Sequence, residues 1–491
     1  MMGLNTEQKE LFSYSVDLDK RLPPEHPLRK IKSIIDFTFV RDEVKDFYGY
    51  NGNESIDPVV IMKLMFLLFY DNIPSERELM RTICYRMDYM WFLGYGLDDE
   101  VPNHSVLSKA RSRWGVDVFE TLFVRIVAQC KMAGLIEGKK IHMDGSLVDA
   151  DASNNAVMKG CPELVDQLRE QLGCEMDKLD EPKEDRPNKY YERKNKGLIN
   201  KTDPDATMVS KRGTGSHARY KTHRAVDDAS GIITATETTS GDVEENSKLI
   251  DLVDQHESNV GITVDTVVAD RQYGTAENYR SCQERGIQSH MGDMLAAQER
   301  KGRREGIFGC EDFKYDAQSD TFTCPAGQTL TRRKHKKTRK AYEYACPAKI
   351  CRECSIRSRC TRAKGGMART VKRHYKHDAV QAGRAQARSD EAIKDHIKRK
   401  WLMEGSFADA ANNHGFKRAR WRQLWRQRIQ DYMIASVQNV RILIREMDRK
   451  PKAVAVKQCE SVYALLLVLM SWSGVHMKVA RAYNRNISFI L

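Results

Sequence analysis

The sequence of 491 residues lacks a long hydrophobic run. Its longest apolar stretch, Val462–Met470, is far shorter than the roughly 20 residues that a membrane-spanning helix needs, and it fits a buried helix better. Residues 1–30 also lack the apolar segment of a secretory signal. We therefore expect a cytoplasmic protein without a membrane partner, whose twelve cysteines are thiols or metal ligands rather than disulfides.

Acidic residues are fewer than basic ones. The chain has 81 Lys and Arg against 68 Asp and Glu, a formal net charge of +13. A basic surface favours a polyanionic partner such as nucleic acid, because Lys and Arg placed on phosphates release counterions. The charge balance alone leaves open an anionic membrane or no such partner. With 41% hydrophobic and 30% charged residues, the composition is that of a folded protein, not a disordered tail.

Changes in composition along the chain predict an α/β protein of several domains. The pattern reads as strand, hairpin, helix and strand from residue 139 to residue 291, with helical segments before and after it. The predicted regions are a helical domain at 1–135 for DNA binding or dimerisation, a core of mixed sheet at 136–309 with a polar insertion at 155–213, a Cys-rich basic insertion at 310–375, a helical part of the core at 376–450 and a C-terminal extension at 451–491.

Three acidic residues stand where metal-dependent chemistry would need them. Asp144 and Asp270 each follow an apolar strand-like run, and Glu404 lies in the helical segment KRKWLMEGSFADAA. Carboxylates held at neighbouring strand ends suit Mg²⁺ or Mn²⁺, and two such ions catalyse phosphodiester displacement. Spacing alone does not single these three out, since other acids compete with them: Asp149, Asp151, Asp227, Asp228 and Asp265.

Long ordered blocks are more specific than spacing. From Pro24 to Leu443 the chain resembles the DDE transposases of bacterial insertion sequences with an InsH-type N-terminal helical domain. The blocks are DPVVIMKLMFLL, VPNHSVLSKARSR, MDGSLVDADAS, YKTHRAVDDASGIITATETTSGD, VVADRQYGTAENY and WLMEGSFADAANNHGFKRARWRQLWRQRIQDYMIASVQNVRIL. The resemblance implies an RNase H-like fold with helices flanking a mixed sheet, in which Asp144, Asp270 and Glu404 are the first, second and third acids.

The resemblance also implies a mechanism. Asp144 would bind both metal ions, Asp270 one and Glu404 the other. Water would hydrolyse a phosphodiester at a transposon end, and the freed 3′-OH would attack target DNA without a covalent protein intermediate. The implied partners are double-stranded DNA and further copies of the chain on paired ends, at the bacterial nucleoid.

One departure from the family pattern bears on activity. Related transposases carry a Lys about seven residues after the third acid, where this sequence has Ala411. Lys417, Arg418 and Arg420 lie further along and are candidate substitutes. Two alternatives therefore stay open: a decayed protein that binds DNA without cutting it, and a nuclease that cuts without strand transfer.

Five cysteines cluster between residues 324 and 360. Cys351 and Cys354 have the spacing of a zinc knuckle, and four thiolates suit tetrahedral Zn²⁺. By resemblance to the family the ligands would be Cys324, Cys351, Cys354 and Cys360, with Cys346 spare. The alternative is a set of reduced thiols without metal. A closed zinc site of this kind would be structural.

Positive charge gathers at residues 331–340 and in the segment 417–428, which we expect to be helical. Its basic side chains are predicted DNA phosphate contacts: Lys417, Arg418, Arg420, Arg422 and Arg426. Trp421 and Trp425 would share one face of that helix, and we expect them to face the core. Tyr273, after the second acid, is predicted to be either a core aromatic residue or a DNA contact.

Overall fold

The computed structural model describes residues 17–48, 55–159, 165–171, 198–210, 215–292, 306–336, 341–363 and 367–449. Three sequence predictions lie partly or wholly outside these residues. They are the C-terminal extension with its apolar run, most of the polar insertion, and the end of the basic run at 331–340. Among the described residues, no helix is long and apolar enough to cross a membrane.

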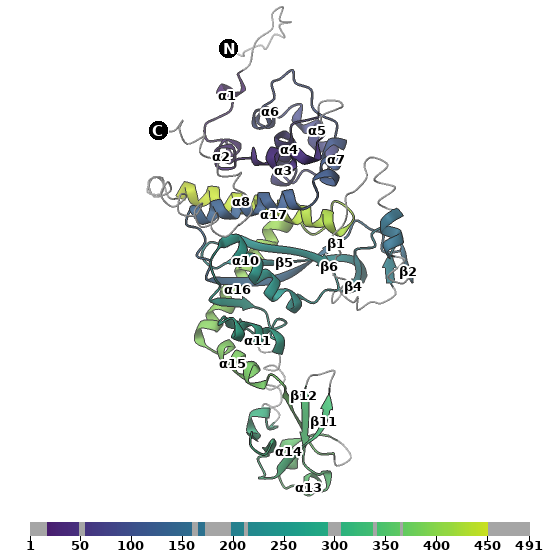
Figure 1. The fold of residues 1–491 in the computed structure, drawn as a ribbon, viewed down its shortest axis with the longest axis vertical. Coiled ribbons are helices and arrows are strands. Elements are labelled where there is room, and N and C mark those ends of the chain that lie inside the picture. The colour runs from purple at the N-terminus through teal and green to yellow at the C-terminus, as the bar shows by residue number, and fades with distance from the viewer. Residues whose placement is uncertain are drawn as a thin grey trace, which may run out of the picture.

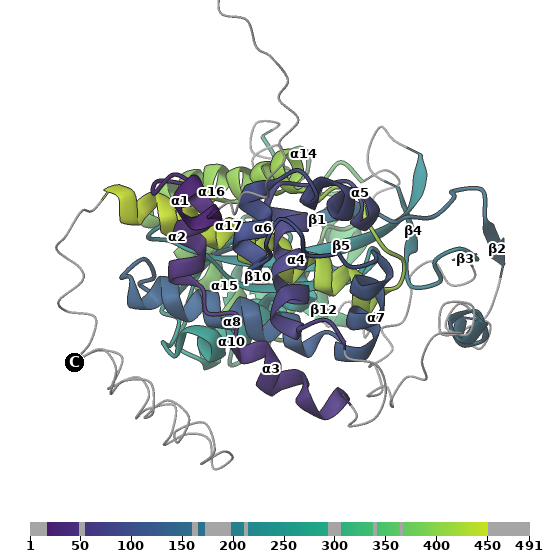
Figure 2. The ribbon, with the colours of Figure 1, turned by 90° about the horizontal axis from the view of Figure 1, so that it is seen from above.

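The N-terminal region is helical, as predicted, and caps one end of the molecule (Figures 1 and 2). Its helices are α1 (Leu18–Arg21), α2 (Pro27–Ile34), α3 (Phe39–Val44), η1 (Lys45–Phe47), α4 (Pro58–Tyr70), α5 (Glu76–Ile83), α6 (Met87–Leu93), α7 (Ser105–Trp114) and α8 (Asp117–Met132). The Asp57 carboxylate caps α4, and the Ser75 hydroxyl caps α5 by accepting from the Glu78 N–H at 3.2 Å. Helix α4 is apolar on nearly all sides and is therefore buried at the centre of this region.

A six-stranded mixed sheet forms the middle of the molecule. Its strands are β1 (Lys140–Asp149), β4 (Thr207–Ser210), β5 (Ser216–Asp227), β6 (Ile233–Ser240), β7 (Thr266–Ala269) and β8 (Gln288–Met291). The order is β4-β5-β1-β7-β8, with β6 also paired to β5. Strand β1 is antiparallel to β5 and parallel to β7. The predicted hairpin with its turn at Asp228–Gly231 is confirmed as β5 and β6.

Helices cover both faces of this sheet. They are η2 (Glu245–Lys248), α10 (Leu249–Val260), α11 (Ala276–Glu284), α15 (His377–Ala387), α16 (Asp390–His414) and α17 (Leu424–Arg449). Side chains of β1 alternate: Ile141 and Met143 join the apolar cluster of α10 and α11. Asp144 points to the other face, where it meets α16. The predicted mixed α/β fold with an N-terminal helical region is confirmed.

A buried ion pair joins β5 to α17. Arg224 is fully buried and donates from Nη2 to Asp431 Oδ1 at 3.0 Å and from Nη1 to Gln438 Oε1 at 2.9 Å. The second oxygen of Asp431 accepts from the hydroxyls of Thr236 and Thr238 on β6. Both charges are therefore compensated inside the protein, and the helix is fixed to the sheet by polar contacts as well as by packing.

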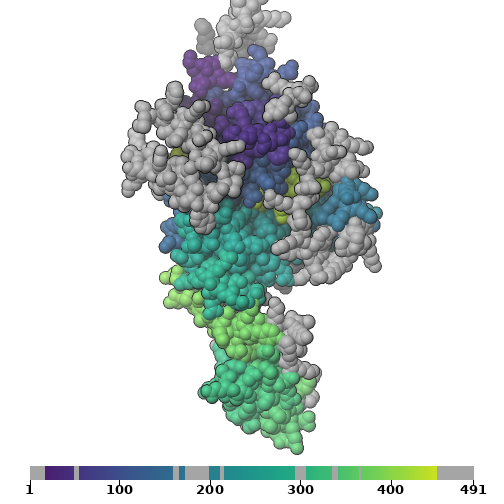
Figure 3. Space-filling view, in the orientation of Figure 1, coloured from purple at the N-terminus to yellow at the C-terminus, as the bar shows by residue number. Residues whose placement is uncertain are grey.

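The Cys-rich region folds as a small unit of its own at the opposite end from the N-terminal helices (Figures 1 and 3). It contains η3 (Cys310–Asp312), β9 (Lys314–Asp316), β10 (Thr321–Thr323), β11 (Thr329–Lys336), β12 (Ala341–Ala345), α13 (Ala348–Arg352), α14 (Arg357–Cys360) and β13 (Thr370–His374). The strands form one antiparallel sheet in the order β13-β12-β11-β10-β9. Its separate apolar core includes Phe313, Phe322 and Tyr344.

Two sequence predictions about local structure were wrong. Strand β4 falls within the range predicted to be an insertion, yet it pairs with β5 in the main sheet; the short strands β2 (Val157–Lys159) and β3 (Leu198–Asn200) pair with each other in the same range. The helix predicted over 417–428 begins only at Leu424. Gly415 ends α16 in a left-handed conformation. The next residues pair with β1: the Asp149 N–H donates to the Lys417 carbonyl at 2.9 Å, and the Ala419 N–H donates to the Asp149 carbonyl at 2.8 Å.

Candidate active site

Asp144 and Asp270 lie at the same level on neighbouring strands. The register of the parallel pair β1 and β7 aligns His142 with Val268. Asp144 lies two residues further along β1, inside the strand, and Asp270 directly follows the last residue of β7. Adjacent strands are about 4.8 Å apart, and the charge of Asp270 acts on the Asp144 carboxyl group. The structure thus brings together the first and second predicted acids.

The carboxyl group of Asp144 is partly buried. Burial raises the pKa of its carboxyl group, and the negative charge of Asp270 raises it further. Arg399 Nη1 donates to Asp144 Oδ2 at 2.9 Å, and the Gly145 N–H donates to Oδ1 at 2.8 Å; both contacts lower the pKa. The net shift is upward. Ionised Asp144 is therefore under-compensated, so added positive charge at this place would stabilise it.

A third carboxylate, Glu245, stands beside these two. Burial raises its pKa; Lys221, 3.5 Å away, lowers it, while Asp144 and Asp270 raise it. Sequence reasoning missed Glu245 because nothing in the run GDVEEN separates it from its neighbours Asp242 and Glu244. Only the packing of β6 and η2 near β1 in the folded protein places Glu245 beside the two aspartates.

The hydroxyl group of Tyr273 completes this arrangement. The side chain is 0% exposed, and its hydroxyl oxygen has no hydrogen-bond partner in the part of the chain that the structure describes. Burial raises its pKa, as do the nearby charges of Glu245, Asp144 and Asp270. The ring packs in the cluster of α10 and α11, so this residue is a core aromatic with an unsatisfied polar end among the three carboxylates.

Helix α16 contributes two more groups to the same region. Besides Arg399, it places His396 near Asp270. Burial lowers the pKa of His396, as do Arg399 and His290, while Asp270 raises it. The neutral imidazole is therefore favoured, and its Nε2 has no hydrogen-bond partner among the residues that the structure describes.

Glu404, the third predicted acid, lies elsewhere on α16. Its side chain is exposed, whereas Leu402 and Met403 beside it are buried. Five residues separate it from Arg399, which is about 140° around a helix of 3.6 residues per turn. The structure therefore does not bring Glu404 together with Asp144 and Asp270. Among the described residues, no three His, Cys, Asp or Glu side chains converge as ligands of one metal ion.

Two family models match the chain on either side of these aspartates. A transposase domain (DUF772) matches residues 16–113, the N-terminal helices, and a transposase DDE domain matches residues 323–444, which include Glu404. Both matches support a DDE transposase. This confirms the family that the sequence blocks indicated. The family acts on DNA and generally uses divalent metal ions.

Other comparisons add little to this family assignment. No curated protein matches the chain. A solved structure of the piggyBac transposase synaptic complex with hairpin DNA shares 9% identity, over 94% of this chain and 83% of that one. The TM-score is 0.36, which is too low to support a conclusion about this transposase.

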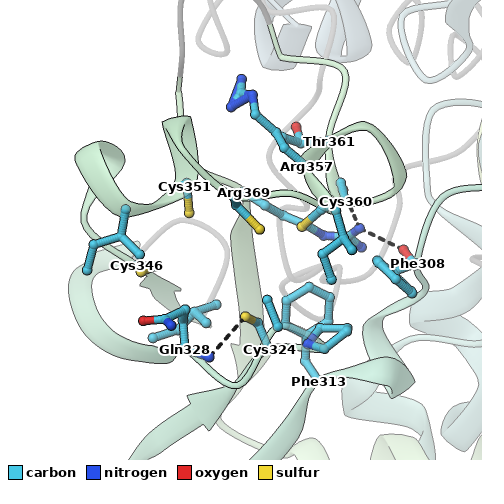
Figure 4. A pocket seen from close by; sticks show the side chains of 16 residues that line it. Phe308, Phe313, Cys324, Gln328, Cys346, Cys351, Arg357, Cys360, Thr361 and Arg369 are labelled. Atoms are coloured by element: carbon cyan, nitrogen blue, oxygen red, sulfur yellow. Dashed lines mark hydrogen bonds between the residues drawn. The ribbon is translucent and has the colours of Figure 1, made fainter.

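Five cysteines of this transposase line a single cavity in the Cys-rich unit (Figure 4). They are Cys324, Cys346, Cys351, Cys354 and Cys360. Burial raises the pKa of Cys346 to about 11, with a further contribution from Cys351, to which it is hydrogen-bonded. Cys346, predicted to be spare, is therefore part of the cluster. Cys324 Sγ accepts from the backbone N–H of Gln328 at 3.4 Å, a contact that also stabilises a thiolate.

The five predicted DNA contacts of the transposase divide into two groups. Arg420 is half-buried: it donates to the carbonyl of Ile73 and to Asn72, and burial lowers its pKa to about 10. Arg426 is buried, with only 5% of its surface exposed. Arg420 therefore joins the N-terminal region to the segment before α17, and Arg426 is not placed to contact DNA.

The remaining three basic residues reach the surface. Lys417 donates to the Ser146 hydroxyl at 2.7 Å, two residues beyond Asp144 on β1. Arg418 and Arg422 both contact Asp151. Trp421 and Trp425 are half-buried against the N-terminal core, with Arg111 over the Trp421 ring at 3.9 Å. The expectation that the tryptophans face the core fits these contacts, although Trp421 precedes the helix.

Proposed function

We propose that this transposase cleaves DNA at the ends of an insertion sequence and joins the freed 3′-OH to target DNA. Asp144 and Asp270 are its first and second acids, and Glu404 is the third. The observation that carries the proposal is the alignment of Asp144 and Asp270 in neighbouring parallel strands. Carboxylates fixed in this way are typical ligands of two-metal phosphodiester chemistry.

The residues present fit a hard divalent ion such as Mg²⁺ or Mn²⁺. Burial disfavours the charged form of Asp144, which a cation would stabilise, and among the described residues the buried Tyr273 hydroxyl has no acceptor, which a metal-bound water or a phosphate oxygen would supply. Divalent ions there would activate water or the 3′-OH and neutralise charge on the phosphate. Asp144 and Asp270 would hold them, while Arg399 keeps Asp144 oriented.

Glu404 is assigned as the third acid because it lies in the block that resembles the family, on the helix that packs against β1 and β7. Its exposed side chain would have to turn toward the aspartates, or α16 would have to rotate. Ala411, where related transposases carry Lys, follows on the same helix. Lys417, Arg418 and Arg422 are the proposed phosphate contacts, since all three reach the surface near the end of β1.

Duplex DNA carrying the terminal inverted repeats that flank the gene tests this function. We expect Mg²⁺-dependent nicking at the repeat ends and covalent joining to a second duplex, both lost in EDTA and in Glu404→Gln. Cleavage without joined products would favour the nuclease, and DNA retention without cleavage would favour the decayed binding protein. Activity in Glu404→Gln equal to that of the unmodified chain would remove Glu404 from the assignment. Transposases act on paired ends, so we also expect a homo-oligomer on such DNA.

We further propose a structural zinc ion held by Cys324, Cys351, Cys354 and Cys360. These side chains line one cavity, and thiolates at four corners match the tetrahedral preference of zinc. The thiols would turn inward and lose their protons on binding, and the binding of Zn²⁺ to the thiolates would offset the cost that the raised pKa of Cys360 adds to its deprotonation.

The purified chain should contain about one zinc ion, and a variant with Cys351→Ser and Cys354→Ser should contain none. Elemental analysis of protein prepared without chelator measures this directly. Cys310→Ser, at an exposed cysteine of the same unit, is the matched control and should keep its zinc. Cys346→Ser should also keep its zinc. Loss of zinc in that variant would show that Cys346 is a ligand in place of one of the four proposed cysteines.

A further inference from the structure

Glu245 occupies a place that the backbone fixes firmly. Strand β6 ends at Ser240, and the chain turns with the Gly241 N–H donating to the Arg219 carbonyl at 3.0 Å. Glu245 then begins η2, and α10 follows with its apolar face buried against the sheet. Lys248 at the end of η2 pairs with Glu237 of β6 at 2.7 Å. The start of this helix is therefore attached to the edge of the sheet, and so is the backbone of Glu245.

Its side chain lies directly over the residue that follows Asp144. A Cβ atom built on Gly145 would come within 2.8 Å of Glu245 Cγ and 2.9 Å of Cδ. Because residue 145 has no side chain, the Glu245 carboxyl group can approach the β1 backbone here. Glu245 is also close enough to Asp144 and Asp270 that the charges of both raise the pKa of its carboxyl group.

A second observation points to a ligand among these acids. The Tyr273 hydroxyl is sealed from solvent and has no hydrogen-bond acceptor among the described residues, and the charges of Glu245, Asp144 and Asp270 all raise its pKa. Buried hydroxyl groups are nearly always hydrogen-bonded, and exceptions call for an absent partner such as water or an ion. An ion carrying water between the carboxylates would supply that partner.

The ion pair with Lys221 does not by itself compensate the negative charge of the Glu245 carboxylate. The separation of Lys221 Nζ from Glu245 Oε1 is 3.5 Å, longer than a direct hydrogen bond in such pairs. The same ammonium group donates to the Val243 carbonyl at 2.9 Å, which fixes Lys221 independently of Glu245. The Glu245 carboxylate can therefore bind another cation.

From this placement we infer that Glu245 is a further carboxylate of the catalytic centre and binds a divalent ion together with Asp144 and Asp270, an inference that rests on the proposed function. The three side chains do not converge as ligands among the described residues, so they would turn toward the ion on binding. It adds a metal-binding residue from the η2 helix to the acids that the sequence blocks supplied. Oxygen ligands from three separate elements, β1, η2 and the end of β7, would then surround the ion, as hard divalent cations prefer.

Binding of Mn²⁺ to the full chain, without DNA, tests this inference by calorimetry or by the loss of the free-ion electron paramagnetic resonance signal. Glu245→Gln should weaken Mn²⁺ binding by about tenfold or more, because mutation of residues that only hydrogen-bond to metal ligands already lowers metal affinity by about 10- to 100-fold. Glu244→Gln removes the same charge from the neighbouring exposed residue and should bind Mn²⁺ like the unmodified chain. Thermal unfolding in EDTA establishes that each variant is folded.

The outcomes separate this inference from the proposed function. Asp144→Asn should lose Mn²⁺ binding; if it binds normally, or if the unmodified chain binds no Mn²⁺, the proposed centre itself is wrong. If Asp144→Asn loses the ion while Glu245→Gln binds it normally, only the inference about Glu245 fails. Combining Lys221→Met with Glu245→Gln distinguishes a metal ligand from a counterion. Weak Mn²⁺ binding in the double variant supports Glu245 as a metal ligand. Recovery of normal Mn²⁺ affinity would show that Glu245 acts only as the counterion of Lys221 and would overturn the inference.

Discussion

Asp144→Asn is expected to abolish DNA strand cleavage while the chain stays folded. Asparagine keeps the shape of the side chain but loses the charge that would hold the divalent ions. Metal ions contribute several kcal/mol to stabilising the transition state of phosphoryl transfer. Since about 1.36 kcal/mol corresponds to a factor of ten in rate, we expect a loss of about 1,000-fold or more. Single-turnover cleavage of end-containing DNA in Mg²⁺ measures it.

The design of this experiment follows from the surroundings of Asp144. Asp265→Asn is the matched control, because Asp265 is an exposed aspartate just before β7 whose partner, Lys139, is also exposed. It should cleave at the unmodified rate. Circular dichroism and DNA retention should be unchanged in both variants. Cleavage by Asp144→Asn within tenfold of the unmodified rate would contradict the assignment of the first acid.

Asp431→Ala is expected to destabilise the fold by about 3–5 kcal/mol, the range for removing one partner of a buried ion pair. It would leave the Arg224 guanidinium fully buried without its carboxylate, and the Thr236 and Thr238 hydroxyls would lose their acceptor. Domains are typically stable by only about 5–15 kcal/mol, so much of the stability would be lost. Urea unfolding, followed by the fluorescence of the tryptophans, measures the change.

A surface pair near the end of the same helix provides the comparison. Asp448 pairs with Lys30 at 2.7 Å, and its side chain is 54% exposed. Asp448→Ala should therefore lose under about 1 kcal/mol. Replacing both buried partners, as Arg224→Met with Asp431→Leu, should cost less than Asp431→Ala alone because no unpaired charge remains. Equal effects of Asp431→Ala and Asp448→Ala would show that the buried pair does not matter for stability.

Local sequence patterns were enough to predict the elements that carry the first two acids. The apolar runs before Asp144 and Asp270 and the turn at Asp228–Gly231 are signals that depend on neighbouring residues. These runs became β1, β7 and the hairpin of β5 and β6. The Ser75 cap was predictable for the same reason, since its hydrogen bond spans three residues.

Predictions that required knowledge of distant partners were the ones that failed or missed a residue. Residues 417–419 have helical composition, yet their backbone pairs with Asp149 of β1, so the helix begins later. Arg426 reads as a basic surface residue, but α17 turns it inward. Glu245 gave no signal at all, because its relation to Gly145 exists only once η2 is placed over β1.

The sequence by itself determined the family, the order of the elements, and the two aspartates that follow apolar runs, although Asp144 lies inside β1 and not at its end. Each of these depends on the identity and spacing of residues along the chain. The tertiary structure alone decided which charges are buried, which face of α16 turns toward Asp144, and that Glu245 and the Tyr273 hydroxyl join that site. Burial and electrostatic coupling depend on groups that meet across the fold, such as Arg224 and Asp431, which are 207 positions apart. No local sequence pattern encodes such long-range contacts.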